Sequence, residues 1–528
     1  MANPRSKIYV CADVKLNKSQ QHTIWFDTQT KQHEYFLSKV VKTFDDYTYL
    51  RKSWSIKVDS DYESASQWTY LCFRNGDVTT ARTYFYFIDR VEYKSENTVE
   101  LFLELDVMQT YLFDYDMLPC FVDREHVDSD AIGEHLIDEG LDVGEVVNNL
   151  EFNIPLSDLC ILMASNVNPA TASATVVQKV QSSIVGGVFS GLAVYATPIE
   201  LAEDLGDMLL NLDTLGYSDG VVSMWMYPKN LITLKNGSWD KPTACMEVSG
   251  TKWGTFNASR NAILDGYIPS NKKLYTYPYN FIYVTNNDGA SATYLYEKFD
   301  DPTDIVFSIV GSATPEAPIK LFPRNYKRSV MNNDEAIPGP SYPTCAWNQD
   351  IYKLWLAQNQ HQLALNQTQA IITAGMGGIQ LLTSLGQEGL DDVASGINSI
   401  LGQIAMKKDK EIQPPQSKGK QSGNVNILTG KQTFTVIYKC VDNYHARIID
   451  DFFTMYGYKC NRVKVPNRNV RASHTYVKTI GCQIKAREGK HLFNNEDITL
   501  IQSIYDKGVT FWKNGDRICE YGDNNIPL

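Results

Sequence analysis

The sequence predicts a β-rich α+β protein with several domains and one long apolar insert. Its 528 residues exceed one ordinary domain, since domains average roughly 150 residues. Aromatic residues make up 12% of the chain, and 33 glycines and 20 prolines supply turns, a mixture that favours strands joined by loops over helical bundles. With 43% hydrophobic and 21% charged residues, the composition is that of a folded soluble protein and excludes overall disorder.

The first predicted domain covers residues 1–155 and is expected to consist of strands. Over residues 99–107 apolar side chains alternate with mostly acidic ones, which is the period of a strand with one buried face. An aromatic-rich run at 83–88 predicts a second strand, and the polar residues 94–97 predict a hairpin loop between the two.

The second predicted domain, residues 156–345, contains further strands and one helix. Apolar runs predict strands at 159–164, 187–196, 221–227 and 281–285. The helix is expected over 199–212, because Pro198 precedes it and its first turn is acidic. The three prolines within 338–343 indicate that neither strand nor helix continues there, so we place a boundary at 336–343.

A third stretch, residues 346–424, is the insert and its linkers. Residues 354–387 are 34 consecutive positions without Asp, Glu, Lys or Arg, and 393–406 are uncharged again. The proline- and glycine-containing linker 413–423 follows. The last predicted domain, 425–528, begins with a strand at 433–438 and is expected to be a β/α segment.

The insert is a candidate membrane-active segment. As a helix, residues 370–385 would reach about 24 Å, which is less than the roughly 30 Å of a bilayer core. Paired with 393–406, it would form a hairpin that inserts or lies in the interface. Ala370, Ala374 and Gly378 recur every four residues and would let helices approach closely in lipid. The alternative is a helical hairpin packed inside the protein or in an oligomer interface.

Charge and cysteine usage exclude several classes of protein. The net charge is −12 and the sequence pI is near 5.3, so sequence-specific binding to DNA or RNA is not expected. The ten cysteines are scattered singly, which predicts reduced, mostly buried thiols in a protein made in a cytoplasm. The N-terminal residues lack the apolar core of a signal peptide.

No motif in the sequence predicts catalysis, a cofactor or a metal. Residues 186–191 have the glycine spacing of a phosphate-binding loop, but Leu192 stands where a lysine is needed, so a strand and turn are predicted. His126 and His135 do not have zinc-ligand spacing. Solvated turns are predicted for the acidic groups Asp59/Asp61/Glu63 and Asp128/Asp130. A solvated loop is predicted for the basic group Arg462/Lys464/Arg468/Arg471, with a contact to DNA or headgroups as the second interpretation.

Several short sequence motifs together resemble those of the tail knob, or distal tail tube, proteins of small short-tailed phages of Gram-positive bacteria. They span most of the chain in family order: ELDVMQTY at 104–111, FVDREHV at 121–127, KLYTYPYNF at 273–281, FTMYGY at 453–458 and GVTFW at 508–512.

The resemblance implies hub-like β-barrel tube domains in a homohexameric ring at the distal end of the virion's tail. It also implies that the insert plugs this tube and is released into the host cell membrane as a channel for genome ejection. Expected partners are an upstream tail tube or collar protein, membrane lipid, and double-stranded DNA that passes through the lumen.

The residues expected to be membrane-active share an apolar or small side chain within 363–406: Leu363, Ala370, Ile371, Ile372, Ala374, Gly375, Met376, Gly377, Gly378, Ile379, Leu381, Leu382, Leu385, Ile397, Ile400, Leu401, Ile404 and Met406. Lys407, Lys408 and Lys410 are expected to contact anionic headgroups. Glu388, Asp391 and Asp392 lie between the two uncharged runs, and their protonation in acid is a hypothesis for the trigger.

Two other functions compete with this one. A tail-tip adhesin would stack surface aromatic residues on cell-wall sugars without acting on membranes. A peptidoglycan hydrolase would need a pair of carboxylates or a metal site, which no motif indicates.

Overall fold

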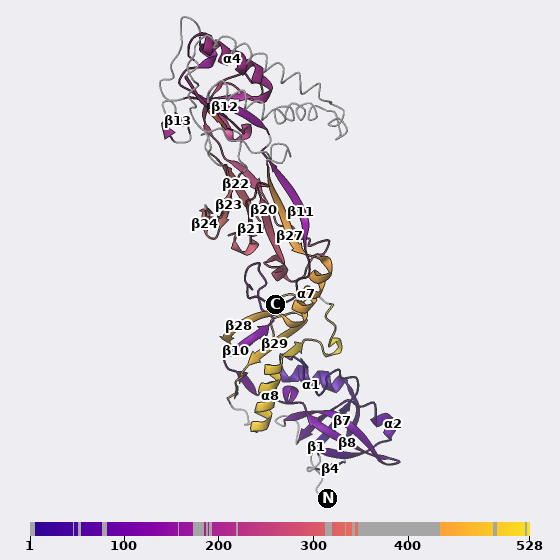
Figure 1. Cartoon of the computed structure of the whole chain (residues 1–528). Coiled ribbons are helices and arrows are strands. Elements are labelled where there is room, and N and C mark those ends of the chain that lie inside the picture. The colour runs from indigo at the N-terminus through magenta and orange to yellow at the C-terminus, as the bar shows by residue number, and fades with distance from the viewer. Residues whose placement is uncertain are drawn as a thin grey trace, which may run out of the picture. The chain divides into compact units, whose positions relative to one another are not determined.

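The computed structural model describes residues 6–45, 47–50, 54–75, 82–156, 158–172, 184–185, 188–189, 193–217, 220–311, 319–332, 334–339, 344–346, 433–488, 494–522 and 525–528 (Figure 1). The chain forms two compact units, each built from more than one stretch of sequence. Unit 1 consists of Met1–Glu145, Gly266–Tyr279 and Val441–Leu528, and unit 2 of Val146–Asp265 and Asn280–Cys440.

The first sheet of unit 1 has seven antiparallel strands in the order β3-β1-β6-β7-β8-β5-β4. They are β1 (Ser6–Cys11), β3 (Val40–Phe44), β4 (Thr48–Leu50), β5 (Ser55–Asp59), β6 (Tyr70–Asn75), β7 (Thr83–Ser95) and β8 (Thr98–Leu105). Helix α1 (Gln29–Ser38) covers part of this sheet, because its buried Phe36 stacks on Tyr70 with ring centroids 5.1 Å apart. The short helix α2 (Tyr62–Ala65) joins β5 to β6.

The second sheet of unit 1 joins distant parts of the chain in the order β2-β31-β29-β10-β28. Strand β2 pairs in parallel with β31, with His22 opposite Thr510. The members are β2 (His22–Ile24), β10 (Cys120–Glu125), β28 (Tyr458–Lys464), β29 (His474–Ile480) and β31 (Val509–Trp512). A small ladder pairs β9 (Tyr115–Met117) with β30 (Ile484–Ala486).

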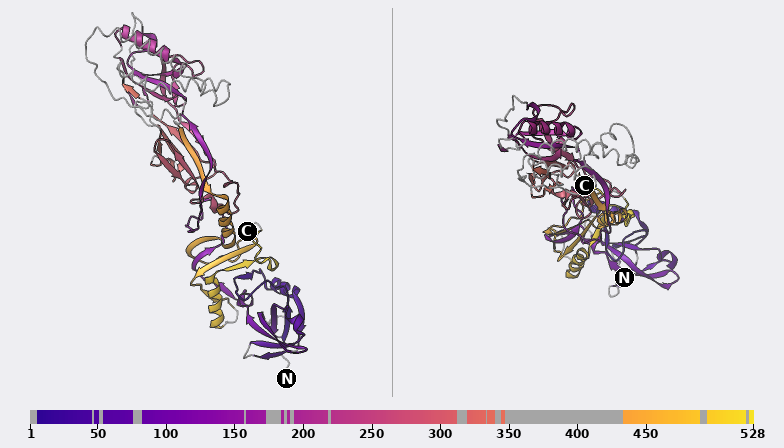
Figure 2. Two further views of the ribbon diagram at one scale, coloured as in Figure 1. Left: turned by 45° about the vertical axis from the view of Figure 1, so that its right-hand side comes forward. Right: turned by 45° about the horizontal axis from the view of Figure 1, so that its top comes forward.

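The described part of unit 1 also contains three further α-helices and two 3₁₀ turns: α3 (Val107–Tyr111), α7 (Asn443–Tyr456), α8 (Asn495–Lys507), η5 (Lys272–Tyr275) and η9 (Gly515–Arg517). Helix α7 begins at Asp442, whose side chain accepts hydrogen bonds from two backbone N–H groups, and ends at Gly457, whose φ is 64°. Helix α8, yellow in Figures 1 and 2, lies against β29 and buries Ile501 and Tyr505 in a cluster that also contains Val477.

The described residues of unit 2 form three larger sheets and one two-stranded ladder. The six-stranded sheet has the order β17-β18-β15-β12-β16-β26, the four-stranded sheet β11-β27-β20-β21, and the third β19-β22-β23-β24 with β25 also paired to β23. Strand β13 pairs with β14. The strands are β11 (Val146–Pro155), β12 (Leu159–Ser165), β13 (Ile184–Val185), β14 (Val188–Phe189), β15 (Ala193–Pro198), β16 (Val221–Pro228), β17 (Ile232–Leu234), β18 (Met246–Thr251), β19 (Gly254–Asn257), β20 (Asn280–Thr285), β21 (Ser291–Tyr294), β22 (Val306–Val310), β23 (Lys320–Tyr326), β24 (Ser329–Met331), β25 (Ile337–Pro338), β26 (Thr344–Ala346) and β27 (Thr433–Val441).

Helix α4 (Ala202–Thr214) covers one face of the six-stranded sheet because its apolar side chains recur at helical spacing. Leu205, Leu209 and Leu212 are fully buried against residues of β12, β15 and β16. Short 3₁₀ turns complete unit 2: η1 (Pro169–Thr171), η2 (Ile199–Leu201), η4 (Lys229–Leu231) and η6 (Tyr296–Lys298).

The structure confirms most of the strands predicted by alternation or apolar runs, including β12, β16, β20 and β27, and the chain is β-rich as predicted. The predicted helix at 199–212 is also present, although its first turn is the 3₁₀ turn η2. Of the strand predicted at 187–196, the described part forms β14 and most of β15. The described cysteine thiols are buried, as predicted, except that of Cys519.

Three local predictions are wrong at their boundaries. Strand β8 ends at Leu105, because the Asp106 side chain accepts a hydrogen bond from Gln109 N at 3.0 Å and begins α3 at Val107. The β7–β8 pairing runs as far as Ser95, so the hairpin loop is residues 96–97 instead of 94–97. At the predicted boundary, Pro338 lies in the two-residue strand β25, a position where a missing N–H is tolerated. The division into four domains stays a prediction.

Candidate functional site

The predicted membrane-active residues, from Leu363 to Met406, lie outside the described residues, as do Lys407, Lys408 and Lys410. The described elements on either side of residues 347–432 are β26 and β27, and both belong to sheets of unit 2. Among the helices that the structure describes, none has the length and apolar character needed to span a bilayer.

Strand β27 is fixed firmly in unit 2. It lies between β11 and β20, and its Phe434, Val436 and Tyr438 side chains are buried. Thr435 Oγ1 donates to Asn153 Oδ1 on β11 at 2.7 Å. Central position, apolar burial and a side-chain hydrogen bond therefore hold the chain where it returns from the insert.

Strand β26 lies at the edge of the six-stranded sheet. It pairs with β16, where Met224 lies opposite Cys345. Just upstream, Gly339 packs so closely that a side-chain carbon there would lie 3.0 Å from the Ile319 carbonyl oxygen and 3.4 Å from Phe434. The two ends of segment 347–432 thus both start from ordered strands of one unit.

The two histidines considered as metal ligands serve other roles. His126 is buried, its Nε2 lies 3.1 Å from Thr454 O, and its Nδ1 accepts from Tyr476 N at 2.7 Å. Burial, with the neighbouring His474 and Arg471 charges, holds the pKa of His126 well below its usual value. His135 stacks on Tyr458. Within the described ranges, no three His, Cys, Asp or Glu side chains gather as a metal site would require.

The acidic groups read as solvated turns are partly structural. Asp61 caps α2 by accepting from Ser64 N at 2.7 Å. Asp130 accepts from the Tyr458 hydroxyl at 2.6 Å. Of the phosphate-loop-like residues 186–191, the two that the structure describes form β14, in agreement with the predicted strand.

The basic group near residue 470 is not a solvated loop, so that prediction is wrong. Arg462 is exposed, but it lies on strand β28. Lys464 forms an ion pair with Glu125, whose side chain is fully buried. The Arg468 guanidinium lies 5.1 Å from the ring centroid of Trp25 and 5.5 Å from that of Tyr115. Arg471 is only 4% exposed. Sequence spacing gave no signal for this, because the aromatic and acidic partners come from the first 125 residues.

A second buried carboxylate, Glu139, holds the loop after β10. It pairs with Arg124 and with Lys273, which is 5% exposed, and it accepts a hydrogen bond from Lys459 N at 3.0 Å. Burial, opposed by Glu139, lowers the pKa of Lys273. Lys273 Nζ also donates to Ile137 O at 2.8 Å. The cluster joins segments of unit 1 that are far apart in the sequence.

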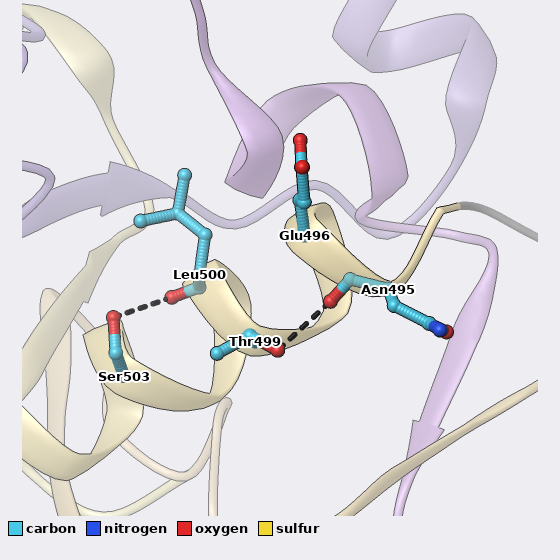
Figure 3. Close-up of a pocket in the computed structure, with 5 residues that line it drawn as sticks. All are labelled: Asn495, Glu496, Thr499, Leu500 and Ser503. Atoms are coloured by element: carbon cyan, nitrogen blue, oxygen red, sulfur yellow. Dashed lines mark hydrogen bonds between the residues drawn. The ribbon is translucent and has the colours of Figure 1, made fainter.

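Two hollows in unit 1 are large enough to hold a small molecule. The first, of about 470 Å³, lies along one face of α8 and is lined by Asn495, Glu496, Thr499, Leu500 and Ser503 (Figure 3). Thr499 Oγ1 donates to Asn495 O at 2.8 Å and Ser503 Oγ to Leu500 O at 2.9 Å. These hydroxyls already bond to the helix backbone and only one helix lines the hollow, so no polar groups converge on a ligand.

The second hollow is a polar cavity of about 750 Å³ lined by the loop after β10, the residues before η5, one side of α7 and the last residues of the chain. Its carboxylates are Asp128, Asp130, Asp450 and Asp451, and its cations are Lys272 and Arg471. The 2% exposed Asp450 accepts from the Tyr267 hydroxyl at 2.7 Å and from Ser270 N at 2.8 Å.

The chain matches known proteins along its whole length. The model of the C-terminal domain of the Bacillus phage phi29 tail knob protein gp9 matches residues 246–526, and that of the N-terminus of caudoviral major tail proteins matches residues 4–116. The chain is 24% identical to the tail knob protein gp9 of Bacillus phage B103, covering 98% of both chains. It is 23% identical to that of phage phi29, again over 98% of both.

A solved structure shows the same fold. The tail knob protein gp12 of bacteriophage C1 superimposes with a TM-score of 0.65 at 14% identity, over 99% of this chain and 100% of that one. None of these descriptions names an enzyme. Because the gp9 domain model alone covers more than half of the residues, the chain belongs to the tail knob protein family and is a structural component of the tail of a short-tailed phage.

Proposed function

We propose that this chain forms a homohexameric ring that closes the distal end of the tail, attached to an upstream tail tube or collar protein. On infection, residues 354–406 leave the ring, enter the host cell membrane and form a channel through which the double-stranded genome passes.

The charge pattern of the insert carries the proposal. Residues 354–387 hold no Asp, Glu, Lys or Arg in a chain whose charged fraction is 21%, so this stretch can leave water at little electrostatic cost. The segment begins beyond β26 and ends before β27, two strands held in the sheets of unit 2. A segment that is anchored at both ends in a folded unit can insert into lipid while the rest of the chain stays in place.

An apolar row on unit 1 supports assembly of several copies. Phe121 on β10 lies opposite Val463 on β28 and Ile480 on β29. These side chains are 36%, 70% and 59% exposed. A contiguous apolar row on a sheet face is typical of a protein–protein contact. The net charge of −12 suits a lumen along which DNA slides without adhering.

Dye release from anionic liposomes tests the membrane activity. The intact protein should release the dye, and a variant with residues 363–406 replaced by a Gly/Ser linker of equal length should not. The matched control replaces only the linker 413–423 and should keep full release. Binding to cell walls without release from any liposome would instead establish the adhesin function.

Mass measurement by light scattering tests the ring. The substitution Ile480→Glu places a charge in the apolar row and should shift hexamers towards smaller species. The exposed control Ile263→Glu, in unit 2, should leave the mass unchanged. A hexamer that tolerates Ile480→Glu and Phe121→Glu would remove the row from the interface.

A further inference from the structure

The walls of the polar cavity in unit 1 are held rigidly by their own hydrogen bonds. Asp450 accepts from Asn271 N at 2.9 Å and from Asn271 Nδ2 at 2.8 Å, in addition to its bonds from Tyr267 and Ser270. Asn271 Nδ2 also donates to Thr454 Oγ1 at 2.9 Å. Because these groups are already paired, they form a fixed frame and leave ligand contacts to other side chains.

Arg471 is the unsatisfied group of this frame. It lines the cavity although only 4% of its surface is exposed. Its Nη1 donates to Asn525 O at 3.0 Å, whereas its buried Nε has no hydrogen-bond partner among the residues that the structure describes. A buried N–H without an acceptor destabilises a protein, so an oxygen atom that reaches Arg471 from the cavity gains a strong hydrogen bond.

The charges of the lining restrict the kind of ligand that could supply this oxygen atom. Four carboxylates face two cations, and His126 is uncharged because burial holds its pKa well below the usual value. Asp130 and Asp128 lie near enough to Arg471 to oppose the lowering of its pKa by burial. An anionic ligand would therefore meet net repulsion next to the one buried cation.

We propose that this cavity binds an uncharged polyhydroxylated ligand, of the class of a sugar ring. A hydroxyl group accepts from an arginine N–H and at the same time donates to a carboxylate, which satisfies both kinds of charge in the lining. Asp128 and Asp451 are exposed residues of the lining, and their carboxylates can accept hydrogen bonds from a ligand. Tyr267 and Tyr521 add ring surface for the C–H face of a sugar. The volume, about 750 Å³, lies within the range of small-molecule sites.

Saturation-transfer NMR on the full-length protein tests the proposal with methyl α-D-glucopyranoside and N-acetylglucosamine as probes. At least one sugar should receive saturation in the ring protons. The variants Asp128→Asn and Arg471→Lys should each weaken binding about tenfold, the factor expected for loss of one hydrogen bond to a charged group. The control Asp59→Asn removes an exposed carboxylate on β5 and should bind as the wild type does.

The outcomes separate clearly. Thermal unfolding checks that each variant is folded, and if Arg471→Lys is not, Asp128→Asn alone decides. No transfer to either sugar overturns the proposal. The proposal is also overturned if neither sugar binds while sodium phosphate or calcium chloride does, and if Asp128→Asn and Arg471→Lys change that ion binding. The measurement does not involve the insert, so its failure leaves the membrane activity untouched.

Discussion

Replacing Glu139 by glutamine is expected to destabilise unit 1 by about 3 kcal/mol. The substitution keeps the size of the side chain but removes the charge that Arg124 and Lys273 share in a buried place. Removing one partner of a buried ion pair costs roughly 3–5 kcal/mol, because the remaining charge stays buried without compensation.

The lower end of that range applies because both cations keep other contacts. Arg124 Nη1 still donates to Gly457 O at 2.8 Å, and its guanidinium still lies 4.6 Å from the Phe452 ring centroid. Lys273 can also release its proton, since burial already lowers its pKa and the opposing effect of Glu139 would be gone.

Differential scanning calorimetry measures the effect. Unit 1 contains about 250 residues, for which each kcal/mol shifts the midpoint by roughly 2–4 °C, so the expected decrease is about 6–12 °C. The control Glu96→Gln alters an exposed carboxylate in the same unit and should shift the midpoint by less than about 1 °C. If Glu139→Gln unfolds at the wild-type temperature, the buried ion cluster does not stabilise the unit.

Three further predictions concern unit 1. Burial lowers the pKa values of His126 and His474, so the unfolded chain binds more protons than the folded chain in mild acid. The midpoint of thermal unfolding should therefore fall as the pH drops below about 6.5. A midpoint that stays constant from pH 7.5 to pH 5 would contradict this prediction. Burial raises the pKa of Asp106 to about 6, so keeping this carboxylate ionised destabilises the folded state at neutral pH. Asp106→Asn should therefore compare more favourably with the wild type at pH 7.5 than at pH 4.5, by about 2 kcal/mol in denaturant titrations. An equal difference at both pH values would show that this carboxyl has an ordinary pKa. Finally, Gly457→Ala should be strongly destabilising, because φ is 64° and a side-chain carbon there would overlap the Glu125 backbone. The control Gly481→Ala has a similar φ of 68° but nothing within 4 Å, so it should destabilise the protein by only about 1 kcal/mol. Equal losses of stability in the two variants would show that the overlap at Gly457 is relieved.

Local patterns predicted local structure well. The β7–β8 hairpin and strands β12 and β16 follow from alternation or apolar runs because each pattern reports on one element and its own buried face. Helix α4 was predicted from Pro198 and the acidic residues of its first turn, which are also local signals, and the structure shows that three leucines at helical spacing form its buried side.

Contacts between distant segments could not be predicted from one sequence. Arg471 belongs to a basic run that is usually solvated, yet it is buried beside residues of the loop after β10 and of η5. Nothing in the spacing of residues 462–471 indicates neighbours that lie from about 200 (Lys272) to about 340 (Asp130) positions upstream. The polar cavity was missed for this reason, because its lining comes from five separate stretches of chain.

The parallel pairing of β2 with β31 sets an order for folding during synthesis. At about 5–20 residues per second, a ribosome needs roughly 25–100 s to travel from His22 to its neighbour Thr510. Every residue of unit 2 is translated within that interval, so unit 2 can complete its sheets while β2 still lacks a neighbour. A nascent chain therefore exposes an unfinished sheet until residue 512 has emerged. Translation that stalls shortly before this point would leave unit 1 incomplete although unit 2 has already folded.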